Sequence, residues 1–377
     1  MQPSAARACA VVLLSAGIAS CAPAPRAQPG GPPAARADAR WARLDSLARA
    51  YHVAGRFDGA VLVAAHGRVI YEGAFGAAVR EWHVPNTVDT RFRIASTTKQ
   101  FTAALVLRLV EAGKLRLDAP VTTWLPEYPR PQGDHLTLHH LLSQTSGLPN
   151  FVARPDFYTR VGRLPHTPAG VVALVDSLPL RFHPGTRWDY SNTNYALLGL
   201  IVERVTGKPY ADALREWVLE PLSLHDTGYD DEERVMPRRA QGYLRADSAW
   251  IRAPFVDPSM IYAAGNLRST VRDLHAWDRA LAAGRVFRDT ASASRMFSRH
   301  VETGLPLGGY GYGVFVGDYV LGGRAVRVIQ HGDTVPGFVA GFWRMPDEGH
   351  AVIVLDNGMH QAVPELVQKL AEVLHDS

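Results

Sequence analysis

Cysteine and lysine are scarce in this chain of 377 residues. The first scarcity bears on disulfide bonds and the second on nucleic-acid binding. Both cysteines, Cys9 and Cys21, lie within the first 21 residues. If a leader that contains Cys9 is removed, no internal disulfide can form. Only four of the 40 basic residues are lysine, and the arginines form no basic stripe with interleaved aromatic residues. We therefore expect no nucleic-acid partner.

Several catalytic signatures are also missing. The sequence has neither the Gly-x-Ser-x-Gly elbow of an α/β-hydrolase nor a His-Glu-x-x-His zinc motif. His135 and His139 have a spacing that would suit a metal, but no third ligand is evident, so surface or packing histidines are the favoured interpretation. We therefore expect neither a metal nor a cofactor.

The first 38 residues have the composition of an export signal and a linker. Residues 1–7 carry a positive charge, and residues 8–20 are apolar or small but too few to span a bilayer. The following Gly-Ile-Ala-Ser-Cys resembles a bacterial lipoprotein box, with Cys21 as the lipidation site of a periplasmic protein that is anchored to the membrane. The alternative is an ordinary signal cut after residues 22–24, which gives a soluble periplasmic or secreted protein. Residues 22–38 are rich in proline and alanine and should form a flexible linker.

Strand patterns lie at both ends of the remaining domain, residues 39–377. Residues 59–76 contain two β-rich runs, and residues 324–358 contain three. Helical patterns dominate between them. We predict an α+β fold in which both ends form one antiparallel sheet flanked by helices, with an all-helical insertion over roughly residues 100–285. The cleft between the two parts is the expected binding site.

The first candidate for chemistry is Ser96-Thr97-Thr98-Lys99, which opens a segment of helical period. Residues three apart share a helix face, so Lys99 should lie beside Ser96. The helix dipole favours a serine alkoxide, and a lysine whose pKa is lowered in a dry cleft can accept the hydroxyl proton. The alternative is a helix-capping serine near a surface lysine.

Two later stretches supply further polar groups. Tyr190-Ser191-Asn192 precedes a second helical pattern, so Tyr190 could relay a proton with Lys99, and Asn192 could hold a substrate carbonyl and the lysine ammonium. By itself the stretch could equally be a polar turn that caps the helix. The third stretch is a strand pattern with His331, for which the alternative is the solvent face of an edge strand.

Together these stretches resemble the motifs of the serine β-lactamase and penicillin-recognising enzyme superfamily, in particular its branch of class C β-lactamases, D-Ala-D-Ala carboxypeptidases and esterases. That superfamily has Ser-x-x-Lys, then Tyr-x-Asn, then Lys-Thr-Gly or His-x-Gly, in this order. The resemblance covers about residues 40–370.

The resemblance implies roles for individual residues. Ser96 would be the nucleophile that forms an acyl-enzyme, and Lys99 with Tyr190 would act first as base and then as acid. Asn192 would position the substrate. The backbone N–H groups of Ser96 and Thr334 would form the oxyanion hole, and the reaction would need no cofactor.

The third motif departs from the family pattern at two positions. His331 stands where a permanently charged lysine is common, and we expect it to be only partly charged near neutral pH. Asp333 stands where glycine is usual, and strand alternation should project its carboxylate beside His331 into the cleft. About 6 Å from a substrate carboxylate, it would cost roughly 2–3 kcal/mol at an effective dielectric near 20. It could instead pair with His331, or a bulge could turn it away.

We therefore predict a serine hydrolase that acts on a small ester or a D-amino-acid peptide. A class C-like β-lactamase ranks below it because of Asp333. The predicted substrate-binding residues are Asn192, His331, Asp333 and Thr334. Gln144, where relatives often carry histidine, should affect packing rather than chemistry. The alternative that is not an enzyme is a non-catalytic envelope sensor or scaffold with the same fold.

Overall fold

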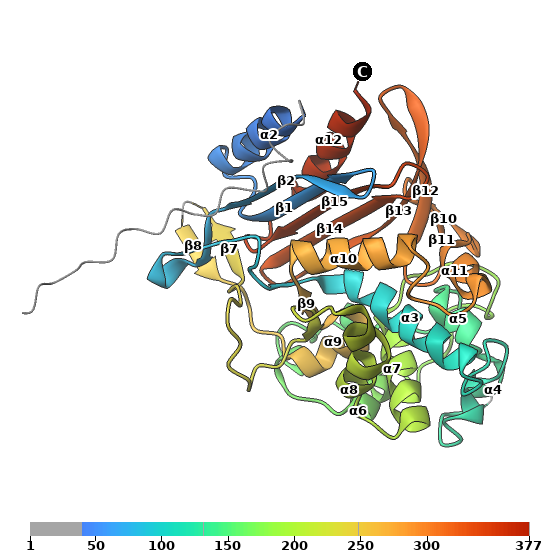
Figure 1. Cartoon of the computed structure of the whole chain (residues 1–377). Coiled ribbons are helices and arrows are strands. Elements are labelled where there is room, and N and C mark those ends of the chain that lie inside the picture. Colours follow the sequence, from blue (N-terminus) through green and yellow to red (C-terminus); the bar gives the residue numbers. More distant parts are fainter. Residues whose placement is uncertain (1–39, 131, 248, 377) are drawn as a thin grey trace, which may run out of the picture.

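The computed structural model describes residues 40–130, 132–247 and 249–376 (Figure 1). The expected signal peptide, the linker and the lipidation site at Cys21 lie outside these described residues. Within the described part of the chain, no helix combines the length and the apolar character needed to cross a membrane.

An antiparallel sheet of eight strands forms the centre of the fold (Figure 1). Its strands, in chain order, are β1 (Gly59–Ala65), β2 (Arg68–Phe75), β10 (Val301–Leu305), β11 (Gly308–Tyr310), β12 (Phe315–Leu321), β13 (Arg324–Val335), β14 (Phe338–Met345) and β15 (His350–Asp356). Their order in the sheet is β10-β11-β12-β13-β14-β15-β1-β2. The N-terminal hairpin joins the C-terminal strands where Val61 pairs with Val354. The predicted sheet from both ends of the chain is confirmed.

Helices cover both faces of this sheet (Figure 1). They are α2 (Trp41–Val53) and α12 (Val363–His375) on one face and α10 (Val271–Ala282) on the other. Neighbouring residues of β1 enter different cores, with Leu62 on the side of α10 and Val61 and Val63 on the side of α2 and α12. Because both faces are covered, every residue of β1 is buried, which explains its continuous apolar run.

The segment between the two ends is mostly helical, but it is not all-helical as predicted. Its helices are α3 (Thr98–Glu111), α4 (Gln132–His135), α5 (Leu138–Leu142), α6 (Pro168–Ala173), α7 (Asn192–Thr206), α8 (Tyr210–Leu214) and α9 (Pro258–Gly265), and α11 (Thr290–Phe297) follows α10. Short strands also occur, namely β3 (Ala77–Val79), β4 (Val84–Pro85), β5 (Phe92–Arg93), β6 (Gly228–Tyr229), β7 (Tyr243–Ala246), β8 (Ala249–Arg252) and β9 (Leu267–Ser269). Strand β9 pairs with both β5 and β6, which are distant in sequence. Such short strands depend on remote partners, so a local pattern does not reveal them.

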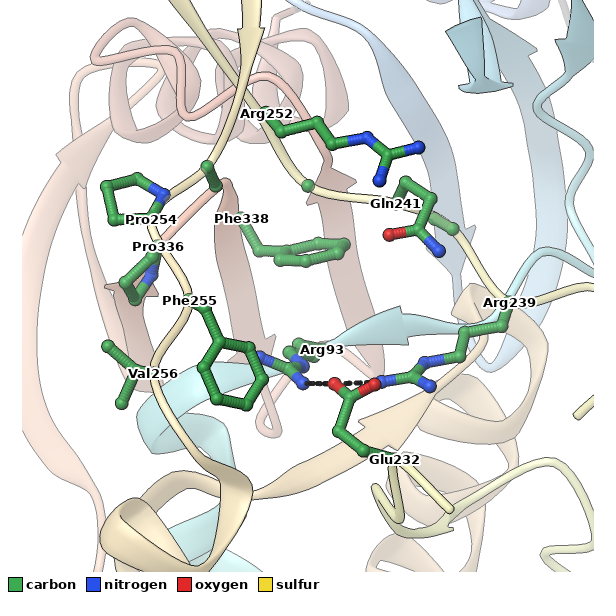
Figure 2. A pocket seen from close by; sticks show the side chains of 13 residues that line it. Arg93, Glu232, Arg239, Gln241, Arg252, Pro254, Phe255, Val256, Pro336 and Phe338 are labelled. Carbon is green, nitrogen blue, oxygen red and sulfur yellow. Dashed lines mark hydrogen bonds and ion pairs between the residues drawn. The ribbon is translucent and has the colours of Figure 1, made fainter. Parts of the chain in front are cut away.

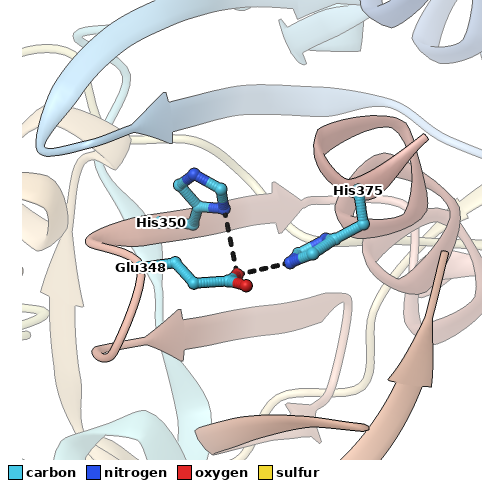
Figure 3. Close-up of side chains that lie close together, drawn as sticks. All are labelled: Glu348, His350 and His375. Carbon is cyan, nitrogen blue, oxygen red and sulfur yellow. Dashed lines mark hydrogen bonds and ion pairs between the residues drawn. The ribbon is translucent and has the colours of Figure 1, made fainter. Parts of the chain in front are cut away.

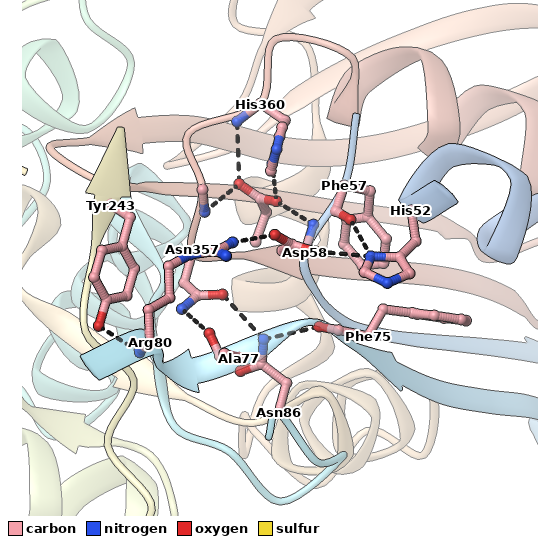
Figure 4. A network of polar contacts seen from close by, with 12 residues as sticks. His52, Phe57, Asp58, Phe75, Ala77, Arg80, Asn86, Tyr243, Asn357 and His360 are labelled. Atoms are coloured by element: carbon pink, nitrogen blue, oxygen red, sulfur yellow. Dashed lines mark hydrogen bonds and ion pairs between the residues drawn. The ribbon is translucent and has the colours of Figure 1, made fainter. Parts of the chain in front are cut away.

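A buried polar network attaches the loop before β7 to the sheet (Figure 4). Asn357, just after β15, donates from Nδ2 to the backbone oxygens of Ala77 at 3.0 Å and Gln241 at 2.9 Å. Its Oδ1 accepts from Asn86 Nδ2 at 3.0 Å. One side chain thus holds three segments together on the insertion side of the sheet.

Candidate active site

Ser96 lies in a single 3-10 turn, Ala95–Thr97, directly before α3. Ala95 has a φ of 48°, a left-handed conformation that is unfavourable for a residue with a side chain. Thr97 Oγ1 donates to the backbone oxygen of His331 at 3.0 Å, so this turn is held against β13. The structure therefore brings the first and third predicted stretches together.

Lys99 lies one helical turn after Ser96 and is fully buried. Its Nζ donates to Ser96 Oγ at 3.0 Å, to Asn192 Oδ1 at 2.8 Å and to the backbone oxygen of Ala264 at 2.8 Å. Burial lowers the pKa of Lys99 to about 7, although the nearby Asp333 carboxylate acts in the opposite direction. An amine with this pKa can exchange a proton near neutral pH, as a general base must.

Tyr190 lies on the other side of the serine hydroxyl. Its OH donates to Ser96 Oγ at 2.7 Å. Burial, assisted by the negative charge of Asp333, raises the pKa of Tyr190 well above its usual value, so the phenol is neutral. Lys99 Nζ lies 4.8 Å from the centre of the Tyr190 ring. The serine hydroxyl thus has two neighbours that can carry its proton.

Three supporting groups complete this arrangement, and two of them were not recognised in the sequence. Asn150 Oδ1 accepts from the backbone N–H of Asn192 at 3.2 Å, and the backbone oxygen of Ala264 binds Lys99. A backbone oxygen leaves no signal in residue type, and Asn150 lies 42 positions before its partner. Gln144 Oε1 accepts from the N–H of Ser191 at 3.0 Å, so Gln144 supports the loop, in line with the expected packing role.

Asp333 contacts the serine directly. Ser96 Oγ donates to Asp333 Oδ2 at 2.9 Å, and the backbone N–H of Thr334 donates to Asp333 Oδ1 at 2.7 Å. The pairing of β13 with β14 continues without a shift through Asp333 and Ala340, so no bulge turns the side chain away. The carboxylate projects into the cleft as strand alternation predicts, but it binds Ser96 rather than His331. It also occupies the Thr334 N–H that is expected to bind the oxyanion.

The position and the charge of His331 differ from the prediction. It lies on an interior strand, is 1% exposed, and packs among the rings of Tyr190, Tyr310 and Phe315. Burial, together with the charge of Lys99, lowers the pKa of His331 to about 3, so the ring is neutral and the predicted partial charge is wrong. The ring lies 6.1 Å from that of Tyr190, centre to centre, and His331 is not among the residues that line the cavity beside Ser96. Its role in substrate binding stays a prediction.

The space beside Ser96 is small and largely apolar. A cavity of ≈ 50 Å³ is lined by polar Asn192 and Asp333 and by apolar residues such as Phe157 and Ile261. Its wall at Pro336 is shared with a second cavity of ≈ 220 Å³. The cleft therefore continues beyond the serine.

Aromatic and charged residues surround this second cavity (Figure 2). Phe255 and Phe338 contribute rings, and Arg93 and Arg239 are joined through Glu232. Because an acidic side chain pairs with both arginines, the cavity does not present two free cations. It suits a substrate group that is apolar with a polar end.

Comparison with known proteins identifies the family of this chain. The model of the beta-lactamase family matches residues 44–376. The chain belongs to the beta-lactamase family. Esterase EstB of Burkholderia gladioli is 42% identical over 206 residues, which are 51% of this chain and 52% of the esterase.

Two solved structures resemble this one over nearly their whole length. A penicillin binding protein from Bacillus halodurans has 27% identity and a TM-score of 0.77, with 88% of this chain and 98% of that chain covered. The D-amino acid amidase from Ochrobactrum anthropi SV3 has 27% identity and a TM-score of 0.76, with 88% and 99% covered. Curated relatives match over less of their length, 52% for EstB and 59% for a Bacillus subtilis protein. The predicted family and the predicted fold are confirmed.

Proposed function

We propose that this beta-lactamase family member forms an acyl-enzyme on Ser96 and hydrolyses small esters or D-amino-acid peptides and amides. The observation that carries the proposal is the approach of Lys99 Nζ and Tyr190 OH to Ser96 Oγ, at 3.0 and 2.7 Å. Neutral Lys99 takes the hydroxyl proton, directly or through Tyr190, as Oγ attacks the substrate carbonyl carbon. The same pair then protonates the leaving alkoxide or amine, and water releases the acyl group.

The Asp333 carboxylate supports a particular choice of substrate. Its Oδ1 holds the Thr334 N–H, so it must turn aside when a substrate oxygen takes that donor. A protonated amine on the substrate would give the displaced carboxylate a charged partner. A β-lactam or a peptide with a carboxylate nearby would meet repulsion instead. The similarity to an esterase and to a D-amino acid amidase agrees with this preference.

The test compares the native protein with Ser96→Ala. Hydrolysis of p-nitrophenyl esters and of D-phenylalanine amide is measured, with L-phenylalanine amide as the stereochemical control. We expect turnover of the ester and the D-amide by the native protein alone. Absence of any turnover by the native protein would favour the non-catalytic sensor or scaffold.

Intact mass after mixing with a penicillin separates the remaining alternatives. A stable adduct on the native protein, absent from Ser96→Ala, would identify Ser96 as the nucleophile and indicate a DD-peptidase with slow deacylation. Rapid drug hydrolysis would favour the β-lactamase. With neither adduct nor hydrolysis, esters and D-amino-acid substrates remain.

We also propose that the protein is exported and anchored through a lipid on Cys21. The composition of residues 1–38 supports this proposal. Cys21→Ala should move the protein from the membrane pellet to the soluble fraction and abolish labelling by a fatty-acid analogue. Cys9→Ala is the matched control and should change neither readout. A label that persists in Cys21→Ala would contradict the anchor.

A further inference from the structure

Three side chains with metal-binding atoms converge far from Ser96 (Figure 3). Glu348 lies in the turn before β15, His350 begins β15, and His375 ends α12. Their ligand atoms all lie within 4.8 Å of one another. Arg324, which contacts Glu348, and Asp333, which contacts Ser96, are separated by about nine residues of β13, or roughly 30 Å. The cluster is thus independent of the candidate active site.

His375 and Glu348 present an unusual pair of atoms to each other. His375 Nδ1 lies 2.7 Å from the backbone oxygen of Ala371, so Nδ1 carries the hydrogen in this contact. In a neutral ring, Nε2 then presents a lone pair, and it lies 2.5 Å from the carboxylate oxygen Glu348 Oε2. Two acceptors that face each other need a cation between them, either a proton or a metal ion.

His350 supplies a second, independent indication. It is 5% exposed, and neither of its ring nitrogens has a hydrogen-bond partner in the described part of the chain. Its Nδ1 points at Glu348 Oε2 from 3.4 Å.

We propose that Glu348, His350 and His375 bind one divalent transition-metal ion, with zinc as the preferred ion. Imidazole nitrogens and a carboxylate oxygen are zinc ligands at about 2.0–2.2 Å, which places tetrahedral ligands roughly 3.3–3.5 Å apart. The distance of 3.4 Å between His350 Nδ1 and Glu348 Oε2 already lies in this range. The His375–Glu348 spacing must open by about 1 Å. Glu348 can provide this movement because it lies in a turn, and its side chain is 23% exposed.

Nearby arginines limit how tightly the ion binds. Arg324 donates to Glu348 Oε1 at 3.1 Å, which leaves Oε2 for the ion, and the charge of Arg40 acts on His350. The ring of His66 lies 4.8 Å from that of His350, centre to centre. The ion would join the end of α12 to the turn before β15. It should therefore raise the melting temperature without changing turnover at Ser96.

The test uses the whole domain after treatment with a chelator and dialysis. Co²⁺ is added and visible absorption is followed, and Zn²⁺ is titrated by calorimetry. We expect one Co²⁺ per chain with the intense absorption of a four-coordinate site, displacement by Zn²⁺, and a melting temperature that rises with Zn²⁺. His350→Gln and Glu348→Gln should lose all three responses. His225→Gln, an exposed histidine elsewhere, should keep them.

Two results would overturn the proposal. Absence of stoichiometric binding in the native protein would mean that a proton, not a metal, lies between His375 and Glu348. Binding that persists in both variants would place the ion elsewhere. Glu348 is a partly exposed turn residue, so Glu348→Gln gives a folded protein even if His350→Gln does not, which circular dichroism checks. Metal binding is read without substrate, so its failure is distinct from failure of the proposed hydrolase activity.

Discussion

Asp333 Oδ2 accepts a 2.9 Å hydrogen bond from Ser96 Oγ, so a carboxylate touches the proposed nucleophile. The other oxygen of Asp333 accepts from the N–H of Thr334 at 2.7 Å. The serine proton is thus directed at Asp333 rather than at Lys99, and one expected oxyanion donor is in use. In the proposed mechanism a substrate oxygen must displace this carboxylate from the Thr334 N–H, so we expect Asp333 to influence which substrates bind.

Asp333→Asn removes the charge but keeps the size of the side chain. Because repulsion of a substrate carboxylate is worth roughly 2–3 kcal/mol, we expect kcat/KM for a β-lactam to rise about 30- to 150-fold. For D-phenylalanine amide it should fall, since its ammonium loses a partner. Steady-state kinetics on both substrates, with a neutral p-nitrophenyl ester as control, measure these two changes in kcat/KM. An equal change on all three would contradict the charge argument.

The pH dependence should report Lys99. Its amine must be neutral to accept the serine proton, and burial lowers its pKa to about 7, so kcat/KM for a neutral ester should rise with pH through about 7. The negative charge of Asp333 favours the ammonium, so Asp333→Asn should move this inflection to lower pH. A profile measured from pH 5 to 9 tests both statements. An inflection that stays in place in the variant would show that Lys99 is not the titrating group.

Tyr190→Phe tests the phenol as a proton carrier. It removes the OH that lies 2.7 Å from Ser96 Oγ and keeps the ring beside His331. We expect kcat for ester hydrolysis to fall by about 10²- to 10⁴-fold with little change in KM.

Tyr195→Phe is the matched control. Tyr195 lies on α7 and is fully buried, but its OH donates to the backbone oxygen of Leu142 at 2.9 Å and not to Ser96. It should keep most of the activity while losing some stability. Equal losses of kcat in the two variants would indicate a general effect on folding instead of proton transfer.

The network at the end of β15 should matter for stability. Asp356 has no exposed surface and accepts from the N–H groups of Asp58, Gly358 and His360 at 3.0, 3.0 and 3.1 Å. Asp356→Ala leaves these buried donors without an acceptor, so the free energy of unfolding should fall by about 3 kcal/mol or more.

An exposed aspartate provides the comparison. The side chain of Asp318 is 57% exposed and pairs with Arg299 on the surface. Asp318→Ala should cost under about 1 kcal/mol. Urea unfolding of both variants measures the difference, and similar midpoints would contradict the structural importance of the buried carboxylate.

Residue spacing alone established the features that depend on local geometry. Ser96 and Lys99 share a helix face because three residues make nearly one helical turn, and strand alternation directed Asp333 into the cleft. The apolar runs at both ends of the chain were sufficient to predict one shared sheet. These properties follow from the backbone periods of helices and strands, so neighbours in sequence reveal them.

Tertiary structure decided the partners and the charges. His331 is neutral because aromatic rings from other segments remove it from water, and Asp333 binds Ser96 because the turn before α3 lies against β13. Docking of α12 brings His375 to Glu348 and His350, a cluster that the sequence did not suggest. Desolvation and contact distance are set by atoms remote in sequence, and they fix protonation and partner choice.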